Sequence, residues 1–535
     1  MHGNRFISAL IRLWLAVMAV AAVSCSKEGE LGGNQPDSRP NINATSEVTV
    51  EFNILDPDSL PATKVDTPNN WGGYDNTASE KVVNNLWLFA VDYDKESGME
   101  TVEEAVKIDL IPGDFTPTGI KTGHTFELSS GIKRFYVGAN MTEEHVNAFR
   151  NKTPMRADSY ESALAMVMDN YDTKTGEGTN ILMFSAPAKD NSTSETDIDI
   201  TSTRFLSITA QLKRLVSKVM VNARYTGNKV NAAGRSDETI PYIETAGGFF
   251  FDFQFILNNT NRALNIAEKF EDTNDLFNTD PNWTLSSVME KDGTGTIRYK
   301  SMWNLNENFS HWGDIDIQSR LEKTSDWWCS SVPSNAVEGN YLGKGLYCLE
   351  NTVFDDYSLE FALTSEEKTE AAYLATTHVY IKARFAPKTI NGDSDNSTNT
   401  TNDRISHLYW QKDAAGNNPY TFYVHKTTGA FFTFTGVRRW IDNSRATSGD
   451  FEEYTGGWVY FRTFFEEGGQ DEDDGIITYD GIEYWGIRRN DYCILTINDI
   501  KNWGDTSPGE AFIKVKSETV PWVKAGKSDI TVTPE

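Results

Sequence analysis

The sequence has few cysteines, and their number limits what they can do. Four occur in 535 residues, at positions 25, 329, 348 and 493. Apart from Cys25, which lies in the leader, three remain, and an odd number cannot form a complete disulfide framework. Cys329 and Cys348 can pair or stay as buried free thiols, and the sequence leaves both open. We therefore expect hydrophobic cores, rather than disulfides, to hold the fold together.

Long apolar runs and positive charge are also scarce. One run, Leu13–Val23, is apolar over about 11 positions, which is typical of a signal peptide and short for a bilayer span. A polytopic membrane protein is therefore excluded. Lysine and arginine number 49 against 77 aspartates and glutamates, so the formal net charge is -28. Such a chain repels polyanions, and we expect no nucleic acid partner.

Motifs for catalysis and metal binding are lacking as well. The 7 histidines are scattered, and none lies in an H-E-x-x-H or other metal-ligand spacing. There is no G-x-S-x-G elbow, no P-loop and no dinucleotide fingerprint. We therefore expect no enzyme activity, no metal site and no cofactor. A structural or binding role is favoured, and a secreted hydrolase is the disfavoured alternative.

What is present begins with the leader, which ends in a lipoprotein-type box. Small residues, Ala22-Val23-Ser24, stand directly before Cys25, as a lipoprotein signal peptidase requires. An ordinary signal peptide followed by a chance cysteine is the alternative. A tract rich in Gly, Asn, Pro and Ser follows, and such composition behaves as a flexible chain. We predict a signal peptide over residues 1–24, lipidation of Cys25 and a flexible tether over 25–46.

Short β-like segments dominate the rest of the chain. Aromatic residues make up 12% of the sequence, which suits half-buried strands better than helices. Helical periodicity is confined to Glu143–Asn151 and Ser159–Asn170, which we interpret as connectors. Strands at this spacing predict an all-β fold with two Greek-key or transthyretin-like β-sandwich domains. The strands expected are 48–55, 82–92, 134–139, 181–185, 206–212, 216–225, 248–257, 377–385, 421–424, 430–434, 458–465, 492–497 and 511–523.

The polar stretch Lys189–Thr203 indicates where one domain ends. It contains almost no large apolar residue, and a new apolar strand opens soon after it. We therefore predict an N-terminal domain over 47–203 and a C-terminal domain over 204–535. No internal repeat and no coiled coil is found.

The first strand of the N-terminal domain is unusually clean. Residues 47–55 alternate between apolar and polar types, which predicts a strand with one buried face. The segment that follows contains two prolines and Lys64, and a trypsin-like protease cuts such loops. A cut between Lys64 and Val65 would disconnect the strand and leave a groove with unpaired backbone groups. The displaced apolar residues would be Val48, Val50, Phe52 and Ile54.

The C-terminus offers a second extended segment, over residues 511–523. It can pair in its own sheet or reach a neighbouring molecule, and we predict it to be a donor strand. Its expected donor residues are Val515, Val520 and Trp522. The alternative, on pattern alone, is that both ends are ordinary strands of their own domains.

Several stretches of the chain resemble one known protein family. The sequence is similar to the Bacteroidales fimbrillins that build type V pili, and most of all to the shaft pilins of the short (minor) fimbriae. The matches are short, but their order and spacing run along nearly the whole chain. They are Cys25–Gly29, Ala62–Val65, Lys81–Phe89, Arg134–Asn140, Leu212–Val219, His378–Arg384, Ile487–Tyr492, Leu495–Ile500 and Val515–Val523.

The resemblance implies a history for the protein. A lipidated precursor reaches the outer membrane, and a surface protease removes the N-terminal strand. The C-terminal strand of one subunit then fills the groove of the next, which is donor-strand exchange. The expected location is the fimbrium and the cell outer membrane. The expected partners are other copies of the chain, related fimbrial subunits, the outer membrane through the precursor's lipid, and host or bacterial surfaces.

Two points separate this chain from the simplest form of that history. Pilins of the family commonly carry Arg at the cut, whereas this chain has Lys64, so a Lys-tolerant protease or another cut site is implied. The donor-like tail favours a shaft subunit over an anchor or tip subunit. The main alternative function is a surface glycan-binding lipoprotein, for which Trp327, Trp328 and Trp485 would be the binding platform.

Overall fold

The computed structural model describes most of the predicted strands, and the described residues all lie within Thr45–Glu535. The longer described ranges are 45–55, 82–116, 119–158, 160–172, 177–230, 239–258, 260–267, 345–354, 376–392, 413–463 and 482–497. Shorter described pieces are 283–284, 289–291, 297–299, 329–330, 332–333, 405, 465, 477–479, 500, 504 and 515–521.

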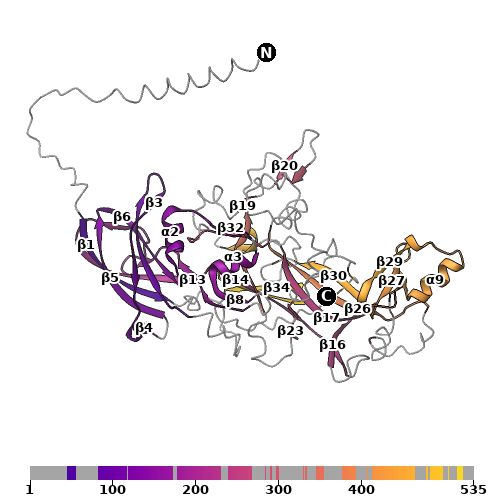
Figure 1. Cartoon of the computed structure of the whole chain (residues 1–535). Coiled ribbons are helices and arrows are strands. Elements are labelled where there is room, and N and C mark those ends of the chain that lie inside the picture. The colour runs from indigo at the N-terminus through magenta and orange to yellow at the C-terminus, as the bar shows by residue number, and fades with distance from the viewer. Residues whose placement is uncertain are drawn as a thin grey trace, which may run out of the picture. The chain divides into compact units, whose positions relative to one another are not determined.

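The N-terminal part of the described chain is built on one ten-stranded sheet (Figure 1). Its hydrogen-bonded order is β3-β2-β6-β10-β13-β1-β5-β4, with β11 beside β13 and β12 beside β6. The strands are β1 (Thr45–Leu55), β2 (Leu86–Asp94), β3 (Met99–Ile108), β4 (Phe115–Thr116), β5 (Gly119–Ser129), β6 (Gly131–Ala139), β10 (Met183–Ser185), β11 (Lys189–Asp190), β12 (Ile198–Ile200) and β13 (Arg204–Arg214).

This sheet folds over on itself into a β-sandwich. Apolar side chains of β1, β5 and β13 share one buried cluster with those of β2, β6 and β12. Strand β13 joins the two layers, because residues 204–211 pair with β1 and residues 212–214 pair with β10. Along these strands, successive side chains point to opposite faces of the sheet. One face of each strand is therefore turned toward the core and the other toward water.

Two short helices cover part of the N-terminal sandwich. Helix α2 (Glu143–Asn151) begins at Thr142, whose hydroxyl accepts a hydrogen bond from the N–H of His145. Helix α3 (Tyr160–Val167) follows β7 (Met155–Arg156) and leads into β8 (Met168–Asp172), which pairs with β9 (Glu177–Ile181). No helix within the described ranges is long and apolar enough to cross a membrane.

The C-terminal part contains three larger sheets. Their orders are β23-β14-β33-β34 with β24 beside β14, β15-β16-β17-β26-β30 with β22 beside β17, and β19-β25-β32-β31. The strands are β14 (Val216–Ala223), β15 (Gly227–Val230), β16 (Thr239–Glu244), β17 (Gly248–Asn258), β19 (Trp283–Thr284), β22 (Cys329–Ser330), β23 (Val332–Pro333), β24 (Leu346–Leu349), β25 (Asn351–Phe354), β26 (His378–Pro387), β30 (Trp458–Thr463), β31 (Ile477–Tyr479), β32 (Ile482–Ile487), β33 (Asp491–Ile497) and β34 (Val515–Pro521).

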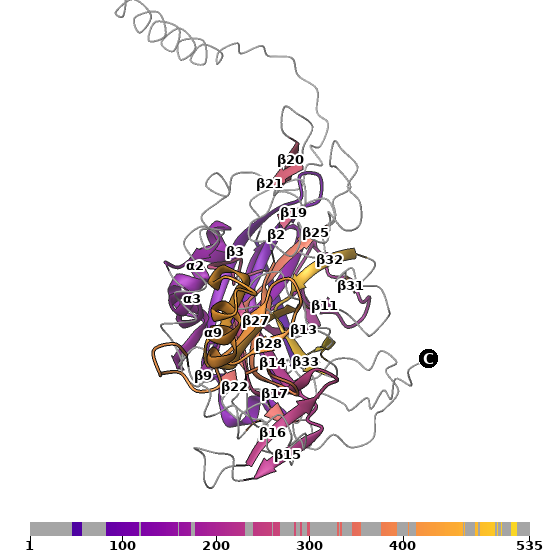
Figure 2. The ribbon, with the colours of Figure 1, turned by 90° about the vertical axis from the view of Figure 1, so that its right-hand side faces the viewer.

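A smaller three-stranded sheet carries the third described α-helix. Strands β28 (Phe431–Phe432), β27 (Phe422–His425) and β29 (Phe451–Tyr454) pair in that order, and α9 (Phe434–Asp442) lies against β27 and β28 (Figure 2). These elements have their own buried cluster. The other described elements are the ribbons β7 with β18 (Ala263–Leu264) and β20 (Met289–Lys291) with β21 (Ile297–Tyr299), and the 3-10 turns η2 (Pro112–Asp114), η6 (Ser448–Asp450) and η7 (Thr455–Gly457).

The all-β prediction is confirmed, and the described helices are short connectors between strands. The predicted boundary between residues 203 and 204 stays a prediction. Strand β13, which follows it, pairs with β1 and β10, and even the polar stretch before it contributes β11 and β12 to the same sheet. The chain passes to the next sheet at Leu215, between β13 and β14.

Candidate functional site: strand β1 and its neighbours

Strand β1 has the alternating burial that its sequence predicts. The side chains of Val48, Val50 and Phe52 are completely buried, and Ile54 is 2% exposed. The residues between them, Thr49, Glu51 and Asn53, are exposed or half-buried on the outer face. One face of the strand is therefore an integral part of the sandwich core.

Strand β1 lies between two other strands and is not at the edge of the sheet. It runs parallel to β13, from Val48 opposite Arg204 to Leu55 opposite Gln211. On its other side it runs antiparallel to β5, from Thr45 opposite Ser129 to Leu55 opposite Gly119. Removing β1 would leave β13 and β5 without a backbone partner on the side that now faces β1.

Phe52 reaches from one layer of the sandwich to the other. Its ring centroid is 6.2 Å from that of Phe126 on β5 and 6.2 Å from that of Phe135 on β6, in edge-to-face geometry. Such aromatic pairs add to the free energy gained from burial alone. Loss of β1 would therefore open a groove whose floor is aromatic.

The outer face of β1 makes polar contacts with both neighbours. The Thr49 hydroxyl is 2.9 Å from that of Thr125, and Glu51 forms a 3.0 Å ion pair with Lys121. On the other side, the Asn53 amide donates to the Ser207 hydroxyl at 3.3 Å. These contacts hold the strand in register over its central and C-terminal parts.

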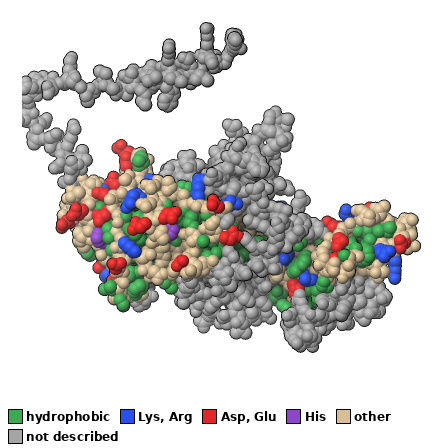
Figure 3. All heavy atoms as spheres, in the orientation of Figure 1, with side chains coloured by type: hydrophobic (Ala, Val, Ile, Leu, Met, Phe, Trp, Pro, Cys, Tyr) green, Lys and Arg blue, Asp and Glu red, His purple; other side chains and the backbone are tan. Residues whose placement is uncertain are grey.

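One cross-strand pair on this face is unfavourable. Glu47 of β1 lies directly opposite Glu127 of β5, and both side chains are exposed. Like charges that face each other across an antiparallel pair destabilise it. Acidic side chains lie over the end of the N-terminal sandwich where β1 and β5 are drawn (Figure 3).

The outer edge of β5 is closed mainly by side chains. Strand β4 pairs only with Gly119 and Ile120. Further along, the Glu104 carboxylate of β3 accepts a hydrogen bond from the Glu127 N–H at 3.2 Å, and the Glu103 carboxylate accepts one from the Ser129 N–H at 2.6 Å. Charged side chains at an edge also discourage pairing with another chain.

A buried lysine supports this closure. The Lys133 side chain on β6 is 0% exposed, and its ammonium lies 2.7 Å from the Glu103 carboxylate and 2.6 Å from that of Asp92. It also donates to the Ser129 hydroxyl at 2.8 Å. A buried ammonium is tolerated because each of its donors has a polar partner. No local sequence signal predicts this group, since its members come from four strands.

The structure places the predicted donor residues Val515 and Val520 in β34. This strand pairs antiparallel with β33 of its own chain, so Val515 lies opposite Ile497 and Val520 lies opposite Tyr492. Among the described strands, β34 has a partner on one side only and stands at the end of its sheet. The role of Val515, Val520 and β34 as donor stays a prediction.

Several predicted site residues lie outside the described residues. These are Cys25, Lys64, Val65 and Trp522, so lipidation, the cut site and one donor residue stay predictions. The side chains of the glycan-platform residues Trp327, Trp328 and Trp485 are also outside the described part. Cys348 is a free, buried thiol, and burial raises its pKa.

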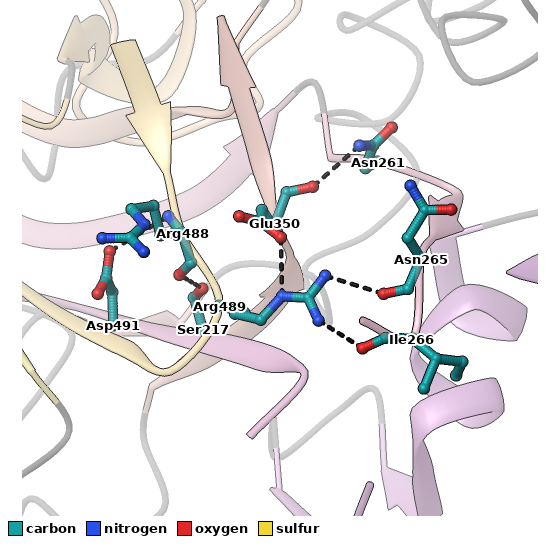
Figure 4. A network of polar contacts seen from close by, with 8 residues as sticks. All are labelled: Ser217, Asn261, Asn265, Ile266, Glu350, Arg488, Arg489 and Asp491. Atoms are coloured by element: carbon teal, nitrogen blue, oxygen red, sulfur yellow. Dashed lines mark hydrogen bonds and ion pairs between the residues drawn. The ribbon is translucent and has the colours of Figure 1, made fainter. Parts of the chain in front are cut away.

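A polar network joins the turn before β33 to two other parts of the chain (Figure 4). The Arg489 guanidinium donates to the Glu350 carboxylate at 2.8 Å and to the backbone oxygens of Ile266 and Asn265 at 2.8 Å and 2.9 Å. Both members of the ion pair are almost fully buried. This network fixes the position of β33, the strand that holds β34.

A polar cleft of about 970 Å³ lies between α2, α3 and the start of β2. Its amide side chains already serve the fold: Asn140 donates to the backbone oxygens of Val82 and Ile181, and Asn84 donates to Asn180. Among the described residues, no three metal-ligating side chains gather into a site. Strand β1 and its two neighbours are therefore the strongest candidate for function.

Comparisons with known proteins give structural neighbours only. No protein-family model and no curated protein sequence matches the chain. Among solved structures, the chain is similar to a candidate cell adhesion protein from Parabacteroides distasonis, with TM-score 0.37 and 11% identity over 90% of this chain and 99% of that one. It is also similar to a fimbrilin from Porphyromonas gingivalis, with TM-score 0.35 and 12% identity over 89% and 98%.

A third similar structure is the tip fimbrial protein Mfa3 from Porphyromonas gingivalis, with TM-score 0.31 and 12% identity over 89% of this chain and 100% of that one. These neighbours are Bacteroidales adhesion and fimbrial proteins, the group that the sequence motifs resemble. Because the identities and TM-scores are low, the function of this chain has to follow from its own strands.

Proposed function

We propose that the chain is a structural subunit of a bacterial surface fimbria that polymerises by exchanging β1 for a strand of another copy. In this proposal the precursor is exported as a lipoprotein through Cys25 and cut after Lys64. The mature subunit is then one strand short. The single observation that supports the proposal most is the interior position of β1, with its four buried side chains and two backbone partners.

The free energy gained when a strand fills the emptied groove is large. Each fully buried Val, Ile or Phe side chain contributes roughly 1.5–3 kcal/mol relative to exposure. The groove left by β1 also exposes unpaired N–H and C=O groups on β5 and β13, which any suitable extended segment can satisfy. An emptied subunit is therefore driven to bind a new strand.

The proposed replacement is the C-terminal tail of a second copy, with Val515, Val520 and Trp522 as donor residues. Among the described strands β34 pairs with β33 alone, and its proposed release breaks that backbone ladder. Subunits joined in this way form a head-to-tail polymer. The proposed partners are other copies, related fimbrial subunits and a host or bacterial surface, at the fimbrium and outer membrane, with no enzymatic step and no cofactor.

Truncation of the tail tests this function. A chain that lacks residues 512–535 should fold and lose its N-terminal segment, yet remain monomeric by gel filtration and electron microscopy. A matched truncation after Pro521 keeps β34 and removes Trp522, so it shows whether polymerisation needs the residues beyond the described strand. Long polymers of the 512–535 deletion would contradict strand exchange.

N-terminal sequencing of the surface-derived protein tests maturation separately. A start at Val65 is expected for a polymerising subunit. A lipid-modified Cys25 in the final product would indicate an anchor subunit or a lipoprotein that is not part of a fimbria.

A further inference from the structure

The pair Glu47–Glu127 is a repulsive cross-strand contact that destabilises the pairing of β1 with β5. The two residues are opposite each other near the start of β1, where Cβ atoms of facing residues are about 4.5–5.5 Å apart. Neither carboxylate forms an ion pair with any described residue. By contrast, Glu51, four residues further along the same strand, has Lys121 at 3.0 Å.

A third carboxylate adds to this repulsion. The Glu104 side chain accepts a hydrogen bond from the Glu127 N–H, so its negative charge stands beside the same pair. Within the described ranges, the one imidazole paired with Glu104 is that of His124, at 3.5 Å from its carboxylate. The N-terminal end of β1 is therefore held less firmly than the part that contains Glu51 and Asn53.

The charge of the proposed replacement strand has the opposite sign. Residues 45–55 contain two glutamates and no lysine or arginine. Residues 512–535 contain four lysines, at 514, 516, 524 and 527, and three acidic residues, at 518, 529 and 535. Exchanging β1 for this tail removes the Glu47 carboxylate from the position opposite Glu127, and the tail brings one more lysine than acidic side chains in its place.

We propose that Glu127 is a specificity-determining residue of the strand site, which weakens the hold on β1 through Glu47 and favours a lysine-bearing strand from a second copy. This inference rests on the proposed strand exchange and names the residue that biases it. Repulsion before exchange and attraction after it act in the same direction. The pair is on the surface, so salt screens both effects.

Charge reversal separates a pairwise effect from a change in net charge. A recognition sequence for a specific protease is placed within residues 56–64 of the full chain, and release of the β1 fragment after cleavage is followed by gel filtration. Variants E47K and E127K each turn the repulsive pair into an ion pair, so release should slow by about three- to tenfold. The double variant E47K/E127K restores like charges at the directly opposed positions, so it should release β1 faster than either single variant.

Capture of the new strand gives a second readout. A labelled peptide of residues 512–535 is added after β1 has left, and binding is measured by fluorescence polarisation. E47K should bind it as the wild type does, because Glu47 departs with β1. E127K should bind it about two- to fivefold more weakly, because a peptide with more lysines than acidic residues then meets a lysine. E96K, which reverses an exposed charge in the turn after β2, is the control and should change neither rate nor affinity.

The two proposals fail in different ways. Release of β1 at the wild-type rate from both single variants, or release from the double variant as slow as from the single variants, would overturn the role of Glu127. Equal capture by E127K and wild type would do the same. If the emptied wild-type chain binds no peptide and forms no polymer, strand exchange itself is wrong, whatever the release rates of the charge variants.

Discussion

Phe52 is the aromatic residue of β1, and its ring meets those of Phe126 and Phe135 on opposite layers of the core. Substituting F52A leaves a cavity that the two layers cannot fill, so we expect the free energy of unfolding of the uncleaved chain to fall by about 3–5 kcal/mol. Urea denaturation followed by circular dichroism measures this. T45A, at the exposed start of β1, should change it by less than about 0.5 kcal/mol.

His378 is a buried histidine whose two ring nitrogens are both engaged. Its Nδ1 is 2.9 Å from the backbone oxygen of Thr376, and its Nε2 is 3.0 Å from the Asn258 amide nitrogen. This arrangement suits the neutral ring, in which Nδ1–H donates and Nε2 accepts. Burial is the main cause that lowers the pKa of His378 to about 4 from the usual 6.5.

This lowered pKa makes stability depend on pH. Below pH 6.5 the unfolded chain binds a proton at His378 that the folded chain does not, so folding weakens as the pH falls from 6.5 toward 4. Between pH 7.5 and pH 5, His378 should remove about 2 kcal/mol of stability. Between the same two pH values, the unfolding free energy of H378Q, measured with urea, should fall by about 2 kcal/mol less than that of the wild type. An unchanged pH slope in H378Q would contradict the neutral buried ring.

At the residue scale, the sequence predicts the buried face of β1 because alternation alone decides which side chains turn inward. It does not predict the buried polar residues. Lys133, Arg489 and His378 each depend on at least one partner that is far away in the sequence, and these partners are Asp92, Glu350 and Asn258. A single sequence contains no local signal that brings such groups together.

At the element scale, local capping explains one confirmed prediction and one error. Helix α2 was predicted over Glu143–Asn151 and has those bounds, with Thr142 as its cap. The predicted strand 430–434 is wrong at its end, because the Thr433 hydroxyl accepts a hydrogen bond from the Gly436 N–H and starts α9 at Phe434. The apolar run there serves a short strand first and then a helix.

Strands β3 and β5 are not among the strands that the sequence predicts. For β3, charged residues are the reason. Burial in β3 is only partial, and its charged residues hide the alternation. Its neighbours explain its composition, since Glu103 and Glu104 satisfy N–H groups of β5 across the gap between the two strands. Edge strands commonly carry such charges. A prediction from composition alone therefore assigns them to loops.

The turn between β32 and β33 depends on the Arg489 network. R489M leaves the buried Glu350 carboxylate without its ion-pair partner, so we expect a loss of about 3–5 kcal/mol of unfolding free energy. The double variant R489M/E350M removes both charges and should lose less than R489M alone. R438M, on the exposed face of α9, is the matched control and should stay within about 0.5 kcal/mol in the same urea titration.

At the scale of the whole described unit, one hydrophobic cluster spans the two parts of the chain. It includes Phe89 and Phe184 of the N-terminal sheet and Val219, Phe250 and Leu495 of the C-terminal sheets. Interfaces of this apolar kind couple neighbouring parts and limit their relative motion. The two sandwiches predicted from the sequence therefore share a core, which a sequence pattern cannot reveal because it concerns contacts between distant strands.

This shared core predicts one cooperative unfolding transition. F52A lies in the N-terminal sandwich, whereas Cys348 is a buried thiol of the C-terminal part. Two urea midpoints are compared, one from the labelling of Cys348 and one from circular dichroism. If the two parts unfold together, F52A should lower both midpoints by the same amount. Peptide mass mapping identifies the labelled cysteine. A midpoint for Cys348 that F52A does not move would mean that the two parts unfold independently.

A strand at the β1 position is bonded along its length to β13 on one side and to β5 on the other. A pull along its axis therefore loads two ladders of hydrogen bonds in shear, and these must yield together. A pull perpendicular to the axis would break them one after another, from one end. Whatever segment occupies this position would resist stretching far better than peeling, and the direction of the applied force would decide how long the joint lasts.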